Sequence, residues 1–224
     1  MALENIIGNL RDAYKQAVPG TVLCVDQLMA ERRTNPELRD NWFYTADGMV
    51  YSMDEGIPTL RITREATNPI LKNIDTAFDQ FMNKGNYLVP SAEFEAVKTA
   101  ADTVTIDLTK LTSQGIDHEY RFLAVDTSKH LSKYNAEEQK LLERVFGVGD
   151  DYTQVMEMLR TSRLRIRQTR VYVLNPWYVT MKGANIIGRA SWLYSLNGNS
   201  NFGVSDRDIR LGNFRVRGVR REVK

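Results

Sequence analysis

The chain has 224 residues, of which 42% are hydrophobic and 26% are charged, a composition that excludes a disordered or collagen-like chain. Mean hydropathy is −0.40, and no stretch approaches the roughly 18 consecutive apolar residues of a membrane span, so we expect no membrane segment and no membrane partner. Cys24 is the single cysteine, which excludes an internal disulfide and a cysteine-based metal cage. The first residues lack the basic flank and apolar core of a signal peptide, so intracellular synthesis is expected.

Charge is distributed unevenly along the chain, although the formal net charge is only +2. Residues 155–224 hold 14 of the 30 basic and 4 of the 28 acidic residues, a net charge of +10. Residues 1–154 therefore carry a net charge of −8. Three interpretations stay open: neutralisation within the fold, contact between the basic part of one copy and an acidic partner or second copy, and binding of nucleic acid.

The first 63 residues predict two helices and three strands. In chain order, the helices cover residues 3–17 and 22–33, and the strands cover residues 42–44, 49–51 and 57–62. Apolar side chains recur at helical spacing in both helical segments. The first two strands flank Ala46-Asp47-Gly48, which predicts a β-hairpin because glycine readily supplies the positive φ of a tight turn.

The middle of the chain predicts four helices and two strands. Asn68-Pro69 opens a helix that continues to Gly85, because asparagine caps a helix and proline is tolerated in its first turn. Asn135 and Glu138 predict a capping box for a helix that ends at Gly147. The remaining elements are helices over 91–101 and 151–160 and strands over 104–108 and 120–125, which we expect to pair.

The last third predicts short β-strands among basic residues, with Pro176 interrupting the first long run. The fold class is therefore α+β, with helices mainly in residues 1–160, a mixed antiparallel sheet and a β-rich C-terminal third. We expect one domain over residues 1–224. The composition shift near residue 150 is a weak candidate boundary between an acidic part, 1–150, and a basic part, 151–224.

Arginine at alternate positions is the clearest chemical feature. Arg163, Arg165 and Arg167 bracket Leu164 and Ile166, and in a strand they would form a row on one face, opposite an apolar face. Arginine binds carboxylate or phosphate in a bidentate way, which suits a fixed polar interface. The alternative is a solvated face paired with local acids. The candidate partner-binding residues are Arg163, Arg165, Arg167, Arg170, Arg215, Arg217, Arg220 and Arg221.

Catalytic constellations are weak in this sequence. Asp47, Asp54 and Glu55 are candidate ligands of a metal-dependent nuclease, but turn positions explain them better. His118 and His130 lie in no recognisable nucleophile motif. Phosphate-binding glycine loops are absent from the sequence. We therefore expect no catalytic residue, no metal ligand and no cofactor, and we expect Cys24 to be buried and inert.

The C-terminal stretch from Ser200-Asn201-Phe202-Gly203 to Arg217-Gly218-Val219-Arg220-Arg221-Glu222 resembles uncharacterised proteins of tailed bacteriophages. The resemblance covers about 25 residues, and no functional motif accompanies it. It implies a virion component or a phage-encoded accessory protein.

The leading hypothesis is a non-catalytic structural subunit of a large particle, a bacteriophage head, neck or tail. Such a subunit would be synthesised in the host cytoplasm, reside in the virion, and contact itself and other virion proteins through the arginine-rich segments. The alternative is a nucleic-acid-binding phage accessory protein, whose affinity would fall steeply with salt. A third hypothesis is the metal-dependent nuclease.

Overall fold

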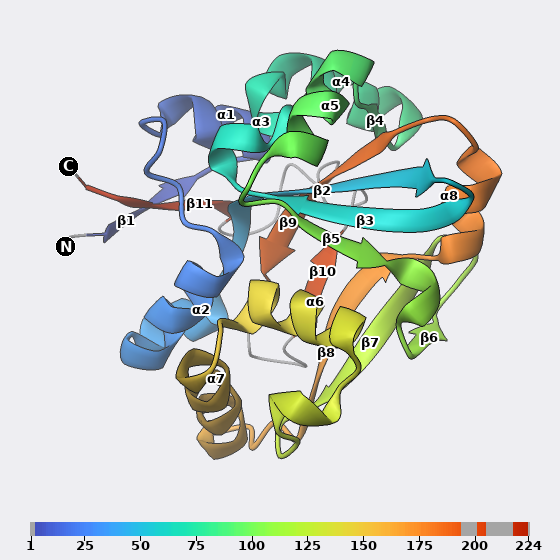
Figure 1. Cartoon of the computed structure of the whole chain (residues 1–224). Coiled ribbons are helices and arrows are strands. Elements are labelled where there is room, and N and C mark those ends of the chain that lie inside the picture. The colour runs from blue at the N-terminus through green and yellow to red at the C-terminus, as the bar shows by residue number, and fades with distance from the viewer. Residues whose placement is uncertain (1–2, 194–200, 205–216, 224) are drawn as a thin grey trace.

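The structure, a computed structural model, describes residues 3–193, 201–204 and 217–223. Its strands form one mixed sheet with the main order β1-β11-β2-β9-β10-β8-β7-β6, to which β3, β4 and β5 are attached (Figure 1). The pairs β10–β8 and β11–β2 are parallel, and the other pairs are antiparallel. The strands are β1 (Leu3–Ile7), β2 (Trp42–Asp54), β3 (Ile57–Thr63), β4 (Tyr87–Leu88), β5 (Val104–Asp107), β6 (Ser113–Gly115), β7 (Tyr120–Asp126), β8 (Gln168–Leu174), β9 (Ile187–Leu193), β10 (Asn201–Val204) and β11 (Arg217–Glu222).

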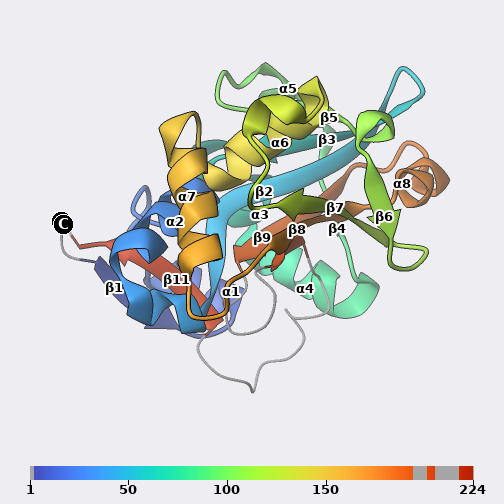
Figure 2. The ribbon, with the colours of Figure 1, turned by 90° about the horizontal axis from the view of Figure 1, so that it is seen from below.

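Two helical layers cover the sheet, which confirms the α+β class. Helices α1, α3, α4 and α5 lie on one side, and α2, α6 and α7 lie on the other (Figures 1 and 2). Each layer encloses its own apolar core against the sheet. The α-helices are α1 (Leu10–Gln16), α2 (Val25–Thr34), α3 (Pro69–Lys72), α4 (Ile74–Lys84), α5 (Ser91–Thr99), α6 (Ala136–Phe146), α7 (Asp150–Thr161) and α8 (Pro176–Lys182), and the short 3-10 helices are η1 (Pro36–Asp40), η2 (Glu65–Thr67), η3 (Leu108–Lys110) and η4 (Leu131–Lys133). No helix in the described ranges combines the length and the apolar character needed to cross a bilayer.

The beginning and the end of the described chain lie side by side. Strand β1 pairs antiparallel with β11, from Leu3 opposite Glu222 to Ile7 opposite Gly218, and both figures of the ribbon show this pair at one edge. The predicted helix over residues 3–17 is therefore wrong in its first half. Helix α1 begins at Leu10, where the side chain of Asn9 accepts a hydrogen bond from the backbone of Asp12.

The predicted hairpin around residues 46–48 is also wrong, because β2 continues through it. The strand shifts register against β9 between Tyr44 and Gly48, and its turn to β3 comes at Glu55-Gly56, where both φ angles are positive. Gly48 allows the Asn68 side chain to approach the β2 backbone closely and does not form a turn. A Cβ built there would lie 2.4 Å from the side-chain oxygen of Asn68.

Local signals in the middle of the chain are confirmed. The capping box of α6 forms between Asn135 and Glu138, and Gly85 ends α4 in the left-handed conformation. The helix predicted from Asn68 to Gly85 is divided at Asn73 into α3 and α4. Strand β5 pairs with β3 while β7 pairs with β6 and β8, so the predicted pairing of these two segments is wrong.

The last third contains one helix that periodicity did not predict. Pro176 begins α8, and the side chain of Asn175 caps it by accepting a hydrogen bond from Trp177. Strands β8, β9, β10 and β11 otherwise give this third its predicted β-rich character. The weak boundary near residue 150 stays a prediction.

Candidate interaction surface

The three alternating arginines lie in the connection between α7 and β8, and not in a strand as predicted. Arg163, Arg165 and Arg167 are all exposed, and Arg165 has a φ of 46°. Leu164 is 49% exposed while Ile166 is buried, so the expected continuous apolar face does not form. We call the exposed side chains of these three arginines the Arg163–Arg167 surface.

Backbone contacts hold this connection in place. Ile166 is buried, and its N–H donates to the Leu159 carbonyl at 3.1 Å. The buried Thr127 donates through its hydroxyl to the Ile166 carbonyl at 2.9 Å and through its N–H to the Arg167 carbonyl at 3.0 Å. A turn hydrogen bond of 2.8 Å joins the Arg165 N–H to the Ser162 carbonyl. The arginine side chains therefore project from a backbone whose position is set by the core.

The Arg163–Arg167 surface is strongly positive. Within the described ranges, no acidic side chain forms an ion pair with any of its three members. The loop that contains Thr127 also contributes the exposed Lys129, whose backbone carbonyl accepts from the Tyr152 hydroxyl of α7 at 3.3 Å. The Lys129 ammonium, however, lies 4.0 Å from the ring centre of Tyr134, and the adjoining end of β7 carries the exposed Asp126, so the positive charge here is that of the three arginines. Such an arrangement attracts carboxylate or phosphate groups.

The other five predicted arginines do not join this surface as far as they are described. Arg170 on β8 is half-buried, with its guanidinium 4.6 Å from the ring centre of Phe122. Arg220 is buried on β11 and donates to the side chain of Asn5 at 2.9 Å, and desolvation lowers its pKa. The backbones of Arg217 and Arg221 belong to β11, but their side chains lie outside the described part of the structure. Arg215 lies outside the described residues altogether.

Asp47, a candidate metal ligand, is instead a buried acceptor. Its carboxylate accepts from the Val25 backbone at 2.7 Å and from Arg64 at 3.2 Å, with Arg144 at 3.7 Å. Desolvation raises the pKa of Asp47 above the usual value, against the opposing charges of both arginines. Arg64 also holds Asp26 through two bonds of 2.6 and 2.7 Å. The sequence signal for this network is weak, because its members come from β2, α2, α6 and the connection between β3 and η2.

The three acids proposed for a nuclease do not converge. Asp47 and Asp54 are seven residues apart on the extended β2, which separates them by about 23 Å. Asp54 bonds to Arg61 and Ser52, and Glu55 lies exposed in the following turn. No group of three or more His, Cys, Asp or Glu side chains suited to a metal ion occurs in the described part. These three acids therefore do not form a shared metal site.

Histidine and cysteine side chains have local partners. His118 packs near Tyr178, with ring centres 6.5 Å apart, and His130 has its Nδ1 atom 2.9 Å from the Ser132 hydroxyl. Cys24 precedes the first turn of α2 and is buried, and desolvation, together with the charge of Asp47, raises its pKa to about 12. Because the thiolate is the reactive form, this thiol is inert near neutral pH.

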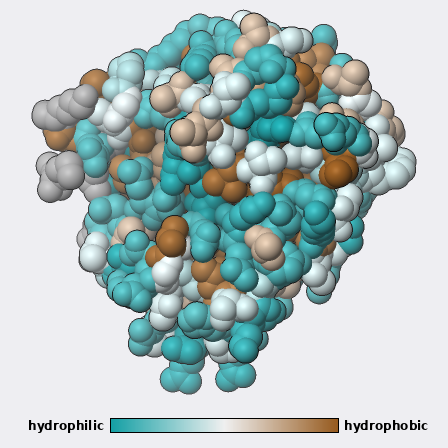
Figure 3. Space-filling model, viewed as in Figure 1, coloured by the Kyte–Doolittle hydropathy of each residue, from teal (hydrophilic) through white to brown (hydrophobic). Residues whose placement is uncertain are grey.

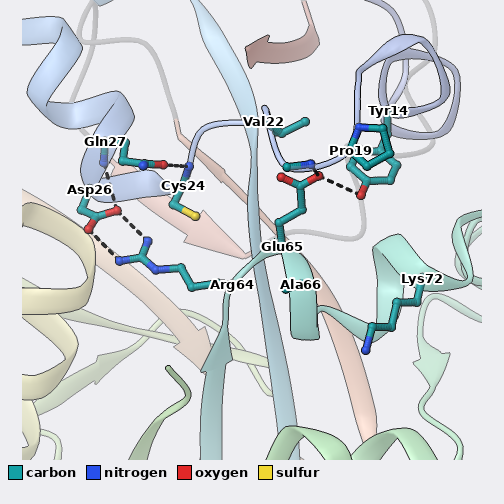
Figure 4. A pocket seen from close by; sticks show the side chains of 11 residues that line it. Tyr14, Pro19, Val22, Cys24, Asp26, Gln27, Arg64, Glu65, Ala66 and Lys72 are labelled. Carbon is teal, nitrogen blue, oxygen red and sulfur yellow. Dashed lines mark hydrogen bonds and ion pairs between the residues drawn. The ribbon is translucent and has the colours of Figure 1, made fainter. Parts of the chain in front are cut away.

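A groove of about 760 Å³ lies beside the Arg64 network (Figure 4). Its polar groups are bonded to one another. Arg64 pairs with Asp26, while Tyr14 and the Gly20 N–H both donate to Glu65, at 3.1 and 2.8 Å. Desolvation and the Glu65 charge raise the pKa of Tyr14 well above its usual value. Most of the charged side chains that line this groove are therefore already paired with other groups of the protein.

No family model and no curated protein matches the chain. The fold is similar to that of a solved structure described by the words "Accommodation of massive sequence variation in Nanoarchaeota by the C-type lectin fold". The TM-score is 0.62 at 13% identity, over 91% of this chain and 93% of that chain. At this identity the likeness shows the fold alone, one similar to what that description calls the C-type lectin fold.

Proposed function

We propose that the chain is a non-catalytic binding protein that acts as a structural subunit of a multiprotein assembly. The Arg163–Arg167 surface would contact acidic surfaces of neighbouring subunits. The observation that carries this proposal is that three arginines are exposed on a core-anchored backbone with no acidic partner among the described residues. Charges on such side chains are available for an external carboxylate, and the fixed backbone lowers the conformational entropy lost on binding.

The fold neighbour supports a binding role over a chemical one. Its description states that the C-type lectin fold accommodates massive sequence variation. Tolerance of sequence variation within a fold suits a protein whose function is recognition. The virion is the particle that the C-terminal phage resemblance predicts, and we keep it as part of the proposal.

Binding to an acidic polymer tests the proposal. Poly-L-glutamate should bind the wild-type chain at low salt. This binding should be lost when Arg163, Arg165 and Arg167 are all changed to alanine. Replacing Lys72, Lys84 and Lys98 by alanine is the matched control, because these exposed cations lie on α3, α4 and α5 in the opposite helical layer. Fluorescence anisotropy over a salt series measures both.

Two outcomes would overturn the proposal. Equal binding by the triple arginine variant and the wild type would place the contact elsewhere. Preference for a short DNA duplex over poly-L-glutamate, with the steep salt dependence of counterion release, would replace it with the nucleic-acid alternative.

A further inference from the structure

We infer that the neighbour which the Arg163–Arg167 surface contacts is a second copy of this chain, arranged head to tail along α7. This inference rests on the proposed function and names its partner. The acidic end of α7 in one copy, defined as Val148, Asp150 and Asp151, would dock on the basic end of the next. The basic end comprises the Arg163–Arg167 surface and Leu164.

The acidic end is exposed and negatively charged. Asp150 and Asp151 occupy the first turn of α7, where the helix dipole favours acidic side chains. One carboxylate oxygen of Asp151 forms an ion pair with Arg33 at 2.9 Å, yet the Asp151 side chain remains 59% exposed. Val148 directly precedes this turn and is 67% exposed. An apolar side chain thus lies beside two carboxylates.

The basic end repeats this pattern with the opposite charge. Leu164, 49% exposed, lies between Arg163 and Arg165, which are both exposed. Arg165 adopts a left-handed φ of 46°, a conformation that costs a residue with a side chain about 1 kcal/mol relative to glycine. A hydrogen bond of 2.8 Å from the Arg165 N–H to the Ser162 carbonyl holds this turn.

The two ends match in charge and in their apolar centres, and they lie at opposite ends of one rigid element. Helix α7 has 12 residues, which places the ends about 18 Å apart. Figure 2 shows α7 crossing the near face of the molecule, with its beginning and its end well separated. Because two different surfaces meet, the contact is heterologous and repeats from copy to copy into a ring or an open filament.

Charge reversal at one end at a time tests this arrangement. The acidic-end variant is D150K/D151K, and the basic-end variant is R163E/R165E. In each variant by itself, the two ends of α7 carry charge of the same sign, so the variant should remain monomeric. An equimolar mixture should associate, because every contact between the two variants is again complementary.

Sedimentation velocity of the full chain over a salt series measures the outcome. The wild type should associate with increasing concentration, and its association should weaken at least tenfold between low and high salt. Circular dichroism checks that the variants fold, and D150N/D151N removes the charge while keeping side chains of nearly the same size. A K72E/K84E control should associate like the wild type.

Failure of this inference is distinguishable from failure of the proposed function. A wild-type chain that binds poly-L-glutamate through its arginines but stays monomeric would overturn the head-to-tail contact alone. Association of the wild type without association of the mixed variants would also overturn it. A wild-type chain that neither binds poly-L-glutamate nor associates with itself would overturn the proposed function as well.

Discussion

Arginines of the interior and arginines of the α7–β8 connection have opposite environments in this protein. Arg189 is fully buried on β9 and donates to the Gly85 carbonyl at 2.7 Å and to Glu119. Arg163 and Arg167 are exposed, and no acid in the described part pairs with them. The same residue type therefore stabilises the fold in one region and is left available to a partner in the other. Sequence spacing alone did not separate these two roles, because it grouped arginines by position and not by burial.

The largest effect is expected when an interior arginine is removed. Arg189→Ala leaves the Glu119 carboxylate and the Gly85 carbonyl without their donor, which should cost about 3–5 kcal/mol of unfolding free energy. Urea denaturation measures it. Arg163→Ala is the matched control and should change stability by less than about 0.5 kcal/mol. Equal losses for both variants would remove the distinction between the two regions.

The apolar anchor of the arginine connection is the next test. Ile166→Ala removes a buried side chain and should cost about 2 kcal/mol or more. Poly-L-glutamate binding should weaken with it, because the backbone that positions the arginines loses its attachment. Leu164→Ala changes an exposed neighbour and should leave stability within about 0.5 kcal/mol. Denaturation and anisotropy together would show whether anchoring and binding are coupled.

The pair Asp54–Arg61 lies between the two extremes and predicts a pH dependence. Burial by itself would raise the pKa of Asp54. The hydrogen bonds from Arg61 and Ser52 lower this pKa by more than burial raises it, so the pKa in the folded protein lies below the usual value. The stabilisation is therefore present above the unfolded pKa of about 3.9 and is lost as pH falls through the folded value.

Asp54→Asn tests this expectation. The variant should be about 1 kcal/mol less stable than the wild type at pH 7, and the difference should disappear in acid. Glu55→Gln is the control in the adjoining exposed turn. Urea denaturation between neutral and strongly acidic pH checks both variants, and a difference that grows in acid would contradict the assignment.

The smallest effect separates strain from charge at one position. Arg165→Gly should raise stability by about 0.5 kcal/mol, because relief of the positive φ is partly offset by the flexibility of glycine in the unfolded chain. Binding to poly-L-glutamate should fall nonetheless. Glu55→Gly, with a φ of 50°, relieves the same strain without touching the arginines and should leave binding unchanged. Thermal melting and anisotropy distinguish the two effects.

Sequence alone determined the elements that depend on neighbours in the chain. The capping box of Asn135 and Glu138, the Asn68 cap and the stop at Gly85 all form by hydrogen bonds that span only a few residues. Such bonds are readable from residue type and spacing. The α+β class followed from the same kind of pattern, but the strand that alternation predicted for Arg163, Arg165 and Arg167 does not form.

Tertiary structure decided what depends on distant partners. Residues 3–7 have helical periodicity, but they become a strand because β11, more than 200 residues away in the sequence, pairs with them. Asp47 looked like a turn residue and became a buried acceptor for the Val25 N–H of α2 and for Arg64, with Arg144 forming an ion pair at 3.7 Å. The physical reason is that strand pairing and charge burial depend on which segments meet in space, and local spacing carries no information about those encounters.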